Sequence, residues 1–219
     1  MAALDTAGPA PRANAPAMRA PVPPAVSGPA ESELGSAAQR DRRKRILDAT
    51  IALASKGGYD AVQMREVAER ADVALGTLYR YFPSKIHLLV SGLAREFEQT
   101  RERLGRKPVP GDTAAERVSY VLHRVTRGMQ REPLIIEAMT RAFMFADPSA
   151  AAEVNAVAAL MEQILTDAMH DGEPTSDERA IARIIGDVWL SNLVAWVTRR
   201  ASATDVTGHL DLAARLLLG

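Results

Sequence analysis

Helical spacing is the feature of this sequence that most constrains its fold. From Gln39 to the C-terminus, apolar residues recur three and four positions apart, and the alternation typical of strands does not persist over any segment. We therefore expect an all-α protein with about nine helices. The predicted helices span about 38–55, 64–71, 75–81, 84–104, 112–131, 133–146, 148–170, 175–200 and 203–218.

Proline content and helix length divide the chain into three parts. Residues 1–36 hold seven of the 13 prolines and almost no large apolar side chains, so we expect a disordered Ala/Pro-rich tail. Two short helices joined by a three-residue turn, and braced by a third, predict a helix-turn-helix domain over 37–84. A connecting helix, 84–104, then leads into a second helical domain over 85–219.

Charge is distributed unevenly between these parts. The formal net charge is zero, but residues 38–107 carry 15 Lys/Arg and 9 Asp/Glu, whereas residues 108–219 carry 10 and 15. A basic segment followed by an acidic one is expected when one domain meets DNA and the other does not. Ordinary variation in surface charge is the alternative explanation. The neutral total argues against a protein that coats nucleic acid indiscriminately.

The sequence lacks the patterns of an enzyme or a metal site. It has no cysteine, its four histidines lack metal-ligand spacing, and it contains no phosphate-binding glycine loop. We predict no catalytic residue, no cofactor and no metal. The longest uncharged apolar run, 188–198, is about half as long as a bilayer span requires. We therefore expect a cytoplasmic protein without membrane contact.

The segment from 75 to 85 carries side chains suited to DNA. It combines aromatic, hydroxyl and cationic groups on one short helix, and a helix fits the major groove. Its N-terminal residues are predicted to reach base edges, and its tyrosines and lysine to reach phosphates. Packing of Tyr79 into the domain core is the alternative. The predicted contacts in this segment are Leu75, Gly76, Thr77, Tyr79, Tyr81 and Lys85.

Polar groups elsewhere in the same domain extend this predicted surface. A run of cations begins the first helix, and two further candidates lie at the start of the second helix. Cations placed near phosphates contribute salt-dependent affinity, although a solvated charged face has the same composition. The candidates are Arg42, Arg43, Lys44, Gln63 and Arg65.

The string Gly76–Lys85 reads Gly-Thr-Leu-Tyr-Arg-Tyr-Phe-Pro-Ser-Lys, and residues 40–90 resemble the DNA-binding domain of TetR-family transcriptional repressors. Two positions depart from the family pattern. Val62-Gln63 stand where a capping Thr is usual, and Asp72 stands at a turn position usually filled by Gly. The resemblance implies a homodimer that binds operator DNA and carries a small hydrophobic effector in its second domain.

Longer segments resemble one group within that family, the actinobacterial repressors of cholesterol catabolism. These segments are 30–36, 39–90, 137–142 and 187–213. The resemblance implies a repressor of sterol-catabolism genes, released by a sterol-derived acid carried as a CoA thioester. A TetR-like repressor of another lipid, acyl-CoA or drug-response pathway would share every motif. A helical enzyme that converts small molecules is the alternative from a different class.

Candidate pocket residues come from a concentration of methionine in the second domain. Five of the eight methionines fall between residues 129 and 169, and methionine lines adaptable apolar cavities well. A plain core with no ligand is the alternative. The predicted pocket residues are Phe97, Met129, Met139, Phe143, Phe145, Met161, Met169, Trp189 and Asn192.

The last two predicted helices carry more apolar side chains than one small domain would bury. In TetR-like regulators these helices form the dimer, and a symmetric dimer suits two DNA half-sites. An ordinary monomeric core is the alternative. The predicted dimer residues are Trp196, Val197, Leu210 and Leu216.

Overall fold

The computed structural model describes residues 31–170 and 172–219, and all regular secondary structure in these residues is helical. The all-α prediction is therefore confirmed, with nine α-helices and one short 3-10 helix in the described residues. The elements are α1 (Glu31–Ala61), α2 (Met64–Arg70), α3 (Leu75–Tyr81), α4 (Lys85–Leu104), α5 (Ala114–Gln130), α6 (Pro133–Met144), η1 (Pro148–Ala150), α7 (Ala151–Met169), α8 (Ser176–Val197) and α9 (Ala203–Leu218).

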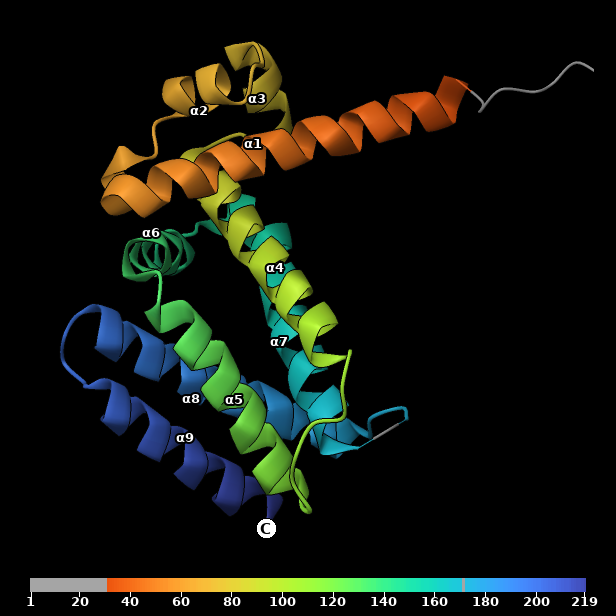
Figure 1. The fold of residues 1–219 in the computed structure, drawn as a ribbon, viewed down its shortest axis with the longest axis vertical. Coiled ribbons are helices and arrows are strands. Elements are labelled where there is room, and N and C mark those ends of the chain that lie inside the picture. Colours follow the sequence, from red (N-terminus) through yellow and green to blue (C-terminus); the bar gives the residue numbers. More distant parts are fainter. Residues whose placement is uncertain (1–30, 171) are drawn as a thin grey trace, which may run out of the picture.

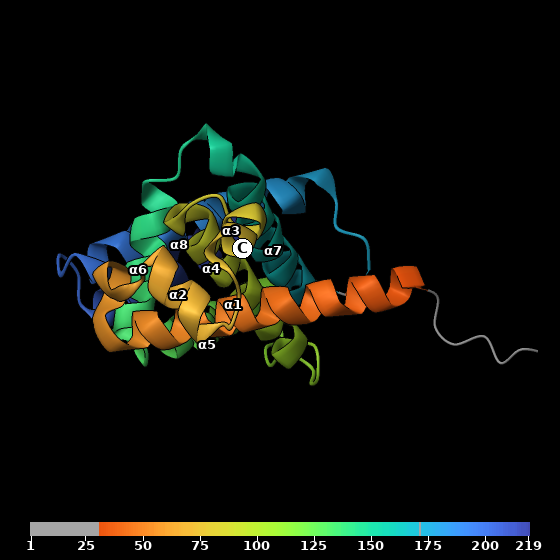
Figure 2. The same cartoon turned by 90° about the horizontal axis from the view of Figure 1, so that it is seen from above.

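The helices form a head and a body that are joined by α4 (Figure 1). The head consists of α1, α2 and α3, and the C-terminus lies at the opposite end of the molecule. Helix α4 runs from the head into the body, where α6 and α7 pack against it and α5, α8 and α9 pack on these helices and on one another. Seen from above, α1 lies across the body and its N-terminal end projects beyond it (Figure 2).

The first half of α4 is buried on all sides. Every residue from His87 to Leu93 is buried, because α4 packs against α1, α6 and α7. The His87 ring also lies 2.9 Å from Ser84 Oγ and 3.1 Å from the Ser149 carbonyl oxygen, which ties the start of α4 to η1. One continuous hydrophobic core therefore runs through the head and the body.

Helix α1 is longer than its sequence predicted. Its helical path begins at Glu31 rather than near residue 38, so the predicted disorder is wrong for residues 31–36; residues 1–30 of the predicted tail lie outside the described residues. The first helix is predicted to end near residue 55, and a break follows at Gly57-Gly58, where both glycines leave helical geometry. A last helical turn then continues to Ala61.

Side-chain caps fix where the body helices begin. Thr113, Thr175 and Ser202 each form a capping box with an acidic residue three positions later. Hydrogen bonds from the Thr175 N–H, from the His170 ring and from the Thr175 hydroxyl lower the pKa of Glu178 to about 2. The Ser84 hydroxyl caps α4 by accepting from the His87 N–H.

Gly58 is held against α6 in a conformation that disfavours a side chain. Its φ is 65°, and a Cβ there would lie 2.7 Å from Glu137 Oε2. That carboxylate oxygen accepts a hydrogen bond from the Tyr59 N–H at 3.0 Å, so it is not free to move away.

Gly58→Ala is therefore expected to lower the free energy of unfolding by about 1–3 kcal/mol. Gly128→Ala is the matched control, because Gly128 lies within α5 and an added methyl group there would meet nothing within 4 Å. It should raise the free energy of unfolding by about 0.5–1 kcal/mol. Urea denaturation at one fixed protein concentration measures both changes. Effects of the same sign would contradict the strain at Gly58.

Candidate DNA interface and effector cavity

The turn between α2 and α3 is closed by the backbone and by one arginine. Asp72 adopts φ 52°, which confirms that an acidic residue here enters the left-handed region. Arg45 donates to the Ala71 carbonyl oxygen at 2.7 Å and thereby satisfies the end of α2. The two short helices are thus held in a fixed relation by groups within the head.

Helix α3 has an inner and an outer face. Leu78 and Phe82 are buried at 0 % and 1 % exposure and pack in the head's core. Tyr79 is 46 % exposed and Gly76 faces open space, so both lie on the outer face. Leu75 and Thr77 are half-buried at the edge. The outward position of Tyr79 favours its predicted contact with DNA over a role in the core.

The flanking candidates lie around this outer face. The Tyr81 hydroxyl accepts from Arg42 at 3.5 Å, and the Arg43 guanidinium lies 5.6 Å from the centre of the Phe82 ring. Lys44 forms an exposed ion pair with Asp48 at 2.9 Å. Two further candidates, Gln63 and Arg65, are exposed, and the Gln63 side chain does not cap α2.

Lys85 is placed differently from its prediction. Its ammonium donates to the Tyr59 carbonyl oxygen at 3.1 Å and lies 4.3 Å from the centre of the Tyr59 ring. Burial lowers the pKa of Lys85 below its usual value. The predicted phosphate contact is corrected accordingly: this lysine is directed at the end of α1 and not outward.

Tyr59 is held between two cations, and this contact joins the head to α6. The Arg141 guanidinium lies 4.4 Å from the centre of the Tyr59 ring, next to Asp60 at 3.5 Å. Glu137, also on α6, accepts from the Tyr59 N–H. We call Tyr59, Lys85, Glu137 and Arg141 the clamp. It fastens α6 to the end of α1 and to the start of α4.

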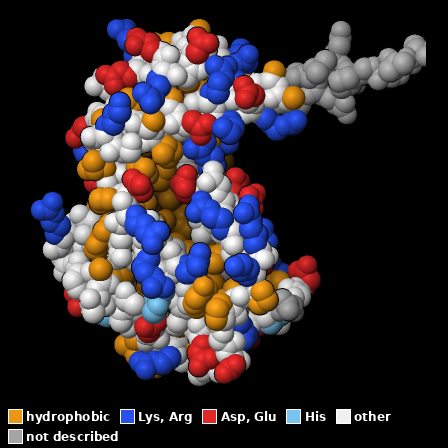
Figure 3. Space-filling view, in the orientation of Figure 1, with side chains coloured by type: hydrophobic (Ala, Val, Ile, Leu, Met, Phe, Trp, Pro, Cys, Tyr) orange, Lys and Arg blue, Asp and Glu red, His pale blue; other side chains and the backbone are white. Residues whose placement is uncertain are grey.

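A cavity of about 770 Å³ lies between the head and the body, bounded by α1, α4, α5 and α6. Figure 3 shows a hollow at this level with hydrophobic side chains in its depth and Lys/Arg side chains beside it. Phe97 and Met129, both predicted pocket residues, line it. We call this the head-side cavity. Its other apolar lining residues are Ile51, Leu104, Val125, Ile135 and Ile136.

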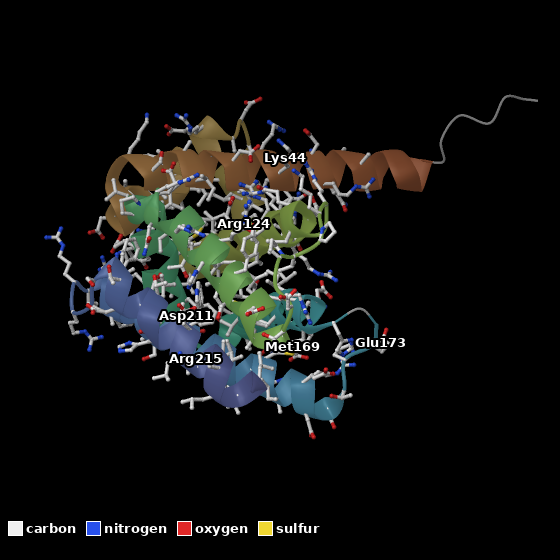
Figure 4. The ribbon with its side chains drawn as sticks, turned by 60° about the horizontal axis from the view of Figure 1, so that its bottom comes forward. Lys44, Arg124, Met169, Glu173, Asp211 and Arg215 are labelled. Atoms are coloured by element: carbon white, nitrogen blue, oxygen red, sulfur yellow. The ribbon has the colours of Figure 1, made fainter. Side chains whose placement is uncertain are left out.

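Four arginines line this cavity, and none of them was predicted from the sequence as a site residue. Within the described residues none of the four forms an ion pair with a carboxylate, although Glu96 and Glu132 also line the cavity. Three lie on one face of α5 or just beyond it, a spacing of three and four that the sequence does display. Figure 4 shows Arg124 on α5 beneath α1. The set is Arg103, Arg124, Arg127 and Arg131, and we call these four the rim arginines.

A second, smaller cavity of about 120 Å³ lies among α4, α6, α7 and α8. Phe97, Phe143, Met161 and Trp189 line it, so five of the nine predicted pocket residues line one cavity or the other. We call this the body cavity. Trp189 is fixed there by donating its indole N–H to Thr126 Oγ1 at 3.3 Å.

The structure corrects the other four predicted pocket residues. Met139 is fully buried against Gly92, and Met169 is buried at the end of α7, so both are core residues. Phe145 is 72 % exposed because the chain leaves α6 just before it. Asn192 donates to the Val188 carbonyl oxygen and its Oδ1 lies 2.9 Å from His209 Nδ1, which places it between α8 and α9.

The predicted dimer residues also differ in burial: some lie in the subunit's own core and others on its surface. Leu210 is fully buried within the subunit, so that prediction is wrong, whereas Leu216 is 75 % exposed. Trp196 and Val197 are half-buried. Two exposed apolar residues of the same helices were missed, Ile184 at 49 % and Leu212 at 45 %. An apolar surface therefore remains uncovered on α8 and α9.

Helix α8 resembles a membrane-spanning helix in its length and composition. Among the described helices it alone is long and apolar enough to cross a membrane, by length and composition, and 28 % of its most apolar window is buried. It carries five charged residues and packs against α7 and α9. One face of α8 nevertheless remains uncovered within the subunit, with Ile184 exposed on it.

Comparisons with known proteins agree on one family. Residues 46–91 match bacterial regulatory proteins of the tetR family, and residues 111–217 match a tetracyclin repressor-like C-terminal domain. The HTH-type transcriptional repressor KstR of Mycolicibacterium smegmatis is 66 % identical over 86 % of this chain and 93 % of its own length. KstR of Rhodococcus jostii is 67 % identical over 86 % of this chain and 88 % of its own length.

Solved structures show the same architecture. A TetR transcriptional regulator from Rhodococcus sp. RHA1 superimposes with a TM-score of 0.77 and 33 % identity, over 83 % of this chain and 97 % of that one. The Thermus thermophilus repressor FadR, solved with lauroyl-CoA, gives 0.64 with 24 % identity, over 80 % and 93 %. The second likeness concerns the fold alone.

A substitution at Gly76 tests the approach of α3 to DNA without disturbing the fold. A methyl group at position 76 meets nothing within 4 Å in the free protein, so Gly76→Ala should leave thermal stability unchanged or slightly raised. On DNA the methyl would obstruct close approach in the groove, and affinity should fall about 5- to 150-fold. Fluorescence anisotropy with a duplex selected from random DNA by the unmodified protein measures this loss.

Gly128→Ala serves again as the control, because it adds the same methyl group to a helix outside the head. Its affinity for the selected duplex should stay within about twofold of the unmodified protein. Unchanged binding by Gly76→Ala would show that α3 does not approach the bases at this position.

Proposed function

The chain belongs to the TetR family of bacterial regulatory proteins, and from that premise we propose that it is a ligand-released repressor of sterol-catabolism genes. One observation carries the proposal: a cavity lined by both apolar side chains and the four rim arginines lies directly between the head and the body. The resemblance to actinobacterial repressors of cholesterol catabolism, and 64–67 % identity to three KstR proteins, support the choice of pathway.

The head supplies the contact with operator DNA. The exposed outer face of α3 enters the major groove, and the cations of α1 lie where they meet phosphates on either side. A homodimer formed through the uncovered faces of α8 and α9 then presents two heads to two half-sites, about 34–36 Å apart or a multiple of that distance. Ile184, Leu212 and Leu216 supply the exposed apolar area of this interface.

The effector is a hydrophobic acid carried as a CoA thioester. Its apolar part enters the head-side cavity, whose volume of about 770 Å³ falls within the range of about 300–1,000 Å³ typical of small-molecule sites. The phosphates of the CoA remain at the mouth. Arginine binds phosphate with two parallel hydrogen bonds, and the rim arginines have no competing ion pair with a described carboxylate. The fold itself accommodates lauroyl-CoA in the Thermus thermophilus repressor.

Release of DNA follows from where the cavity lies. Its walls include Ile51 on α1 and Ile135 on α6, so a ligand between them moves one helix relative to the other. The clamp transmits that movement to the end of α1 and the start of α4. A ligand that binds better when the two heads are wrongly spaced shifts the population away from the DNA-binding state. Operator DNA then weakens effector binding by the same factor.

The test is a titration of the protein–operator complex with three ligands. A sterol side-chain acid as its CoA thioester, a straight-chain fatty acyl-CoA and the free sterol acid are compared by fluorescence anisotropy. Release by the sterol thioester alone supports the proposal. Release only by the fatty acyl-CoA would assign the protein to another lipid pathway, and release by none would overturn the effector class.

Arg124→Gln and Arg127→Gln are each expected to weaken binding of the CoA thioester about 2- to 5-fold, as for partly exposed ion pairs. Binding of the free acid should not change, because it lacks the phosphates. Arg101→Gln is the control: Arg101 lies on α4 two residues before Arg103 but is paired with Asp167 at 2.8 Å. Isothermal titration calorimetry gives the affinities. Equal losses of affinity for the thioester and for the free acid would show that these arginines do not recognise the phosphates.

Arg141→Gln tests the clamp. It removes the cation above Tyr59 and the ion pair with Asp60, so the factor by which effector weakens DNA binding should fall about 2- to 10-fold. DNA affinity without effector should remain close to that of the unmodified protein. Arg179→Gln, which removes an exposed pair with Glu173, is the control. An unchanged coupling factor would show that α6 acts on the head by another route.

A further inference from the structure

Phe97 stands between the two cavities. Among the described residues it is the only one that lines both the head-side cavity and the body cavity. Its side chain is 1 % exposed, so the packed ring separates the two cavities. The ring is packed like other core side chains, so a ligand that extends from one cavity into the other has to displace it.

The contact that holds Phe97 in this position is specific and weak. Its ring meets Trp189 edge to face, with centroids 5.7 Å apart and planes at 74°. Such a pair contributes about 0.5–1.5 kcal/mol beyond the area it buries. Trp189 is anchored to Thr126 by its indole N–H, whereas the phenyl ring of Phe97 has no polar anchor. Phe97 is therefore the less firmly anchored ring of the pair.

The body cavity is suited to the end of a ligand and not to a whole one. Its volume of about 120 Å³ is well below the range of about 300–1,000 Å³ for independent sites. Leu93, Val157, Met161 and Leu193 make its walls largely apolar. Thr140 also lines it, is 5 % exposed, and its hydroxyl makes no hydrogen bond to another described residue. An apolar terminus that carries one oxygen would satisfy that hydroxyl.

We propose that Phe97 is a gate that selects effectors by length, and that the body cavity receives the end of the effector farthest from the CoA. A short acyl group fills the head-side cavity and leaves the gate closed. A long or rigid one displaces the ring from Trp189 and enters the body cavity. This inference rests on the proposed function, because it takes the rim arginines to hold the CoA at the other end.

Octanoyl-, lauroyl- and stearoyl-CoA, together with the sterol thioester, provide the probes. In Phe97→Leu the gate no longer has an aromatic contact to break, so the longer ligands should bind about 2- to 10-fold more tightly while octanoyl-CoA is unaffected. Gly186→Leu fills the body cavity, where a Cβ meets Met161 at 3.4 Å. It should weaken the long ligands and spare octanoyl-CoA. Met129→Leu, which alters only the head-side cavity, should leave the length preference unchanged.

Tryptophan fluorescence reports the position of the Phe97 ring directly and does not depend on a comparison of affinities. With Trp196→Phe, Trp189 is the remaining tryptophan of the chain, and its emission reports the loss of the Phe97 ring. Long ligands should change the emission, and octanoyl-CoA should not. Retained operator binding shows that each variant is folded.

The outcomes separate this inference from the function on which it rests. If no acyl-CoA binds the unmodified protein, the proposed function fails. If the ligands bind but Phe97→Leu and Gly186→Leu keep the same length profile, or if octanoyl-CoA changes the Trp189 emission as much as the long ligands do, the gate alone is overturned.

Discussion

The buried first half of α4 is the constraint on which the rest of the structure depends. From His87 to Leu93 this helix has no exposed face, because α1, α6 and α7 enclose it. Close-packed interiors do not deform continuously but pass between discrete arrangements. A helix that is buried along the segment joining two parts cannot let one part move alone. Head and body therefore respond together to whatever occupies the space beside α4.

Several cations of the basic segment serve the fold rather than DNA. Arg45 closes the turn between α2 and α3, and Lys85 stacks on Tyr59. Arg95 pairs with Asp48 at 2.7 Å across α4 and α1. The net positive charge counted over residues 38–107 therefore overstates what faces DNA. The surface left for phosphates is narrower than the composition implies and lies mainly along α1 and the outer face of α3.

Local patterns in the sequence were sufficient for the helices and the head, because periodicity, caps and turn residues act over a few positions. Asp72, Ser84 and Gly57-Gly58 behave as their neighbours in sequence dictate. The clamp could not be anticipated, since Tyr59 and Glu137 are 78 residues apart. Leu210 and Leu216 show the same limit: both are leucines of one helix, and only its packing against α5 and α8 decides which is buried.

The rim arginines at the cavity mouth have a consequence for selectivity. A cluster of guanidinium groups attracts any polyphosphate, and a cell contains nucleotides and free CoA in abundance. Such anions can occupy the rim without reaching the space between α1 and α6, so they leave the packing around α4 untouched. Binding of phosphates by the rim arginines is thereby separated from the conformational response, which depends on what fills the space between α1 and α6. Under the proposed function, the rim arginines bind CoA-bearing molecules in general, and only the buried portion of the ligand determines whether the protein releases its operator.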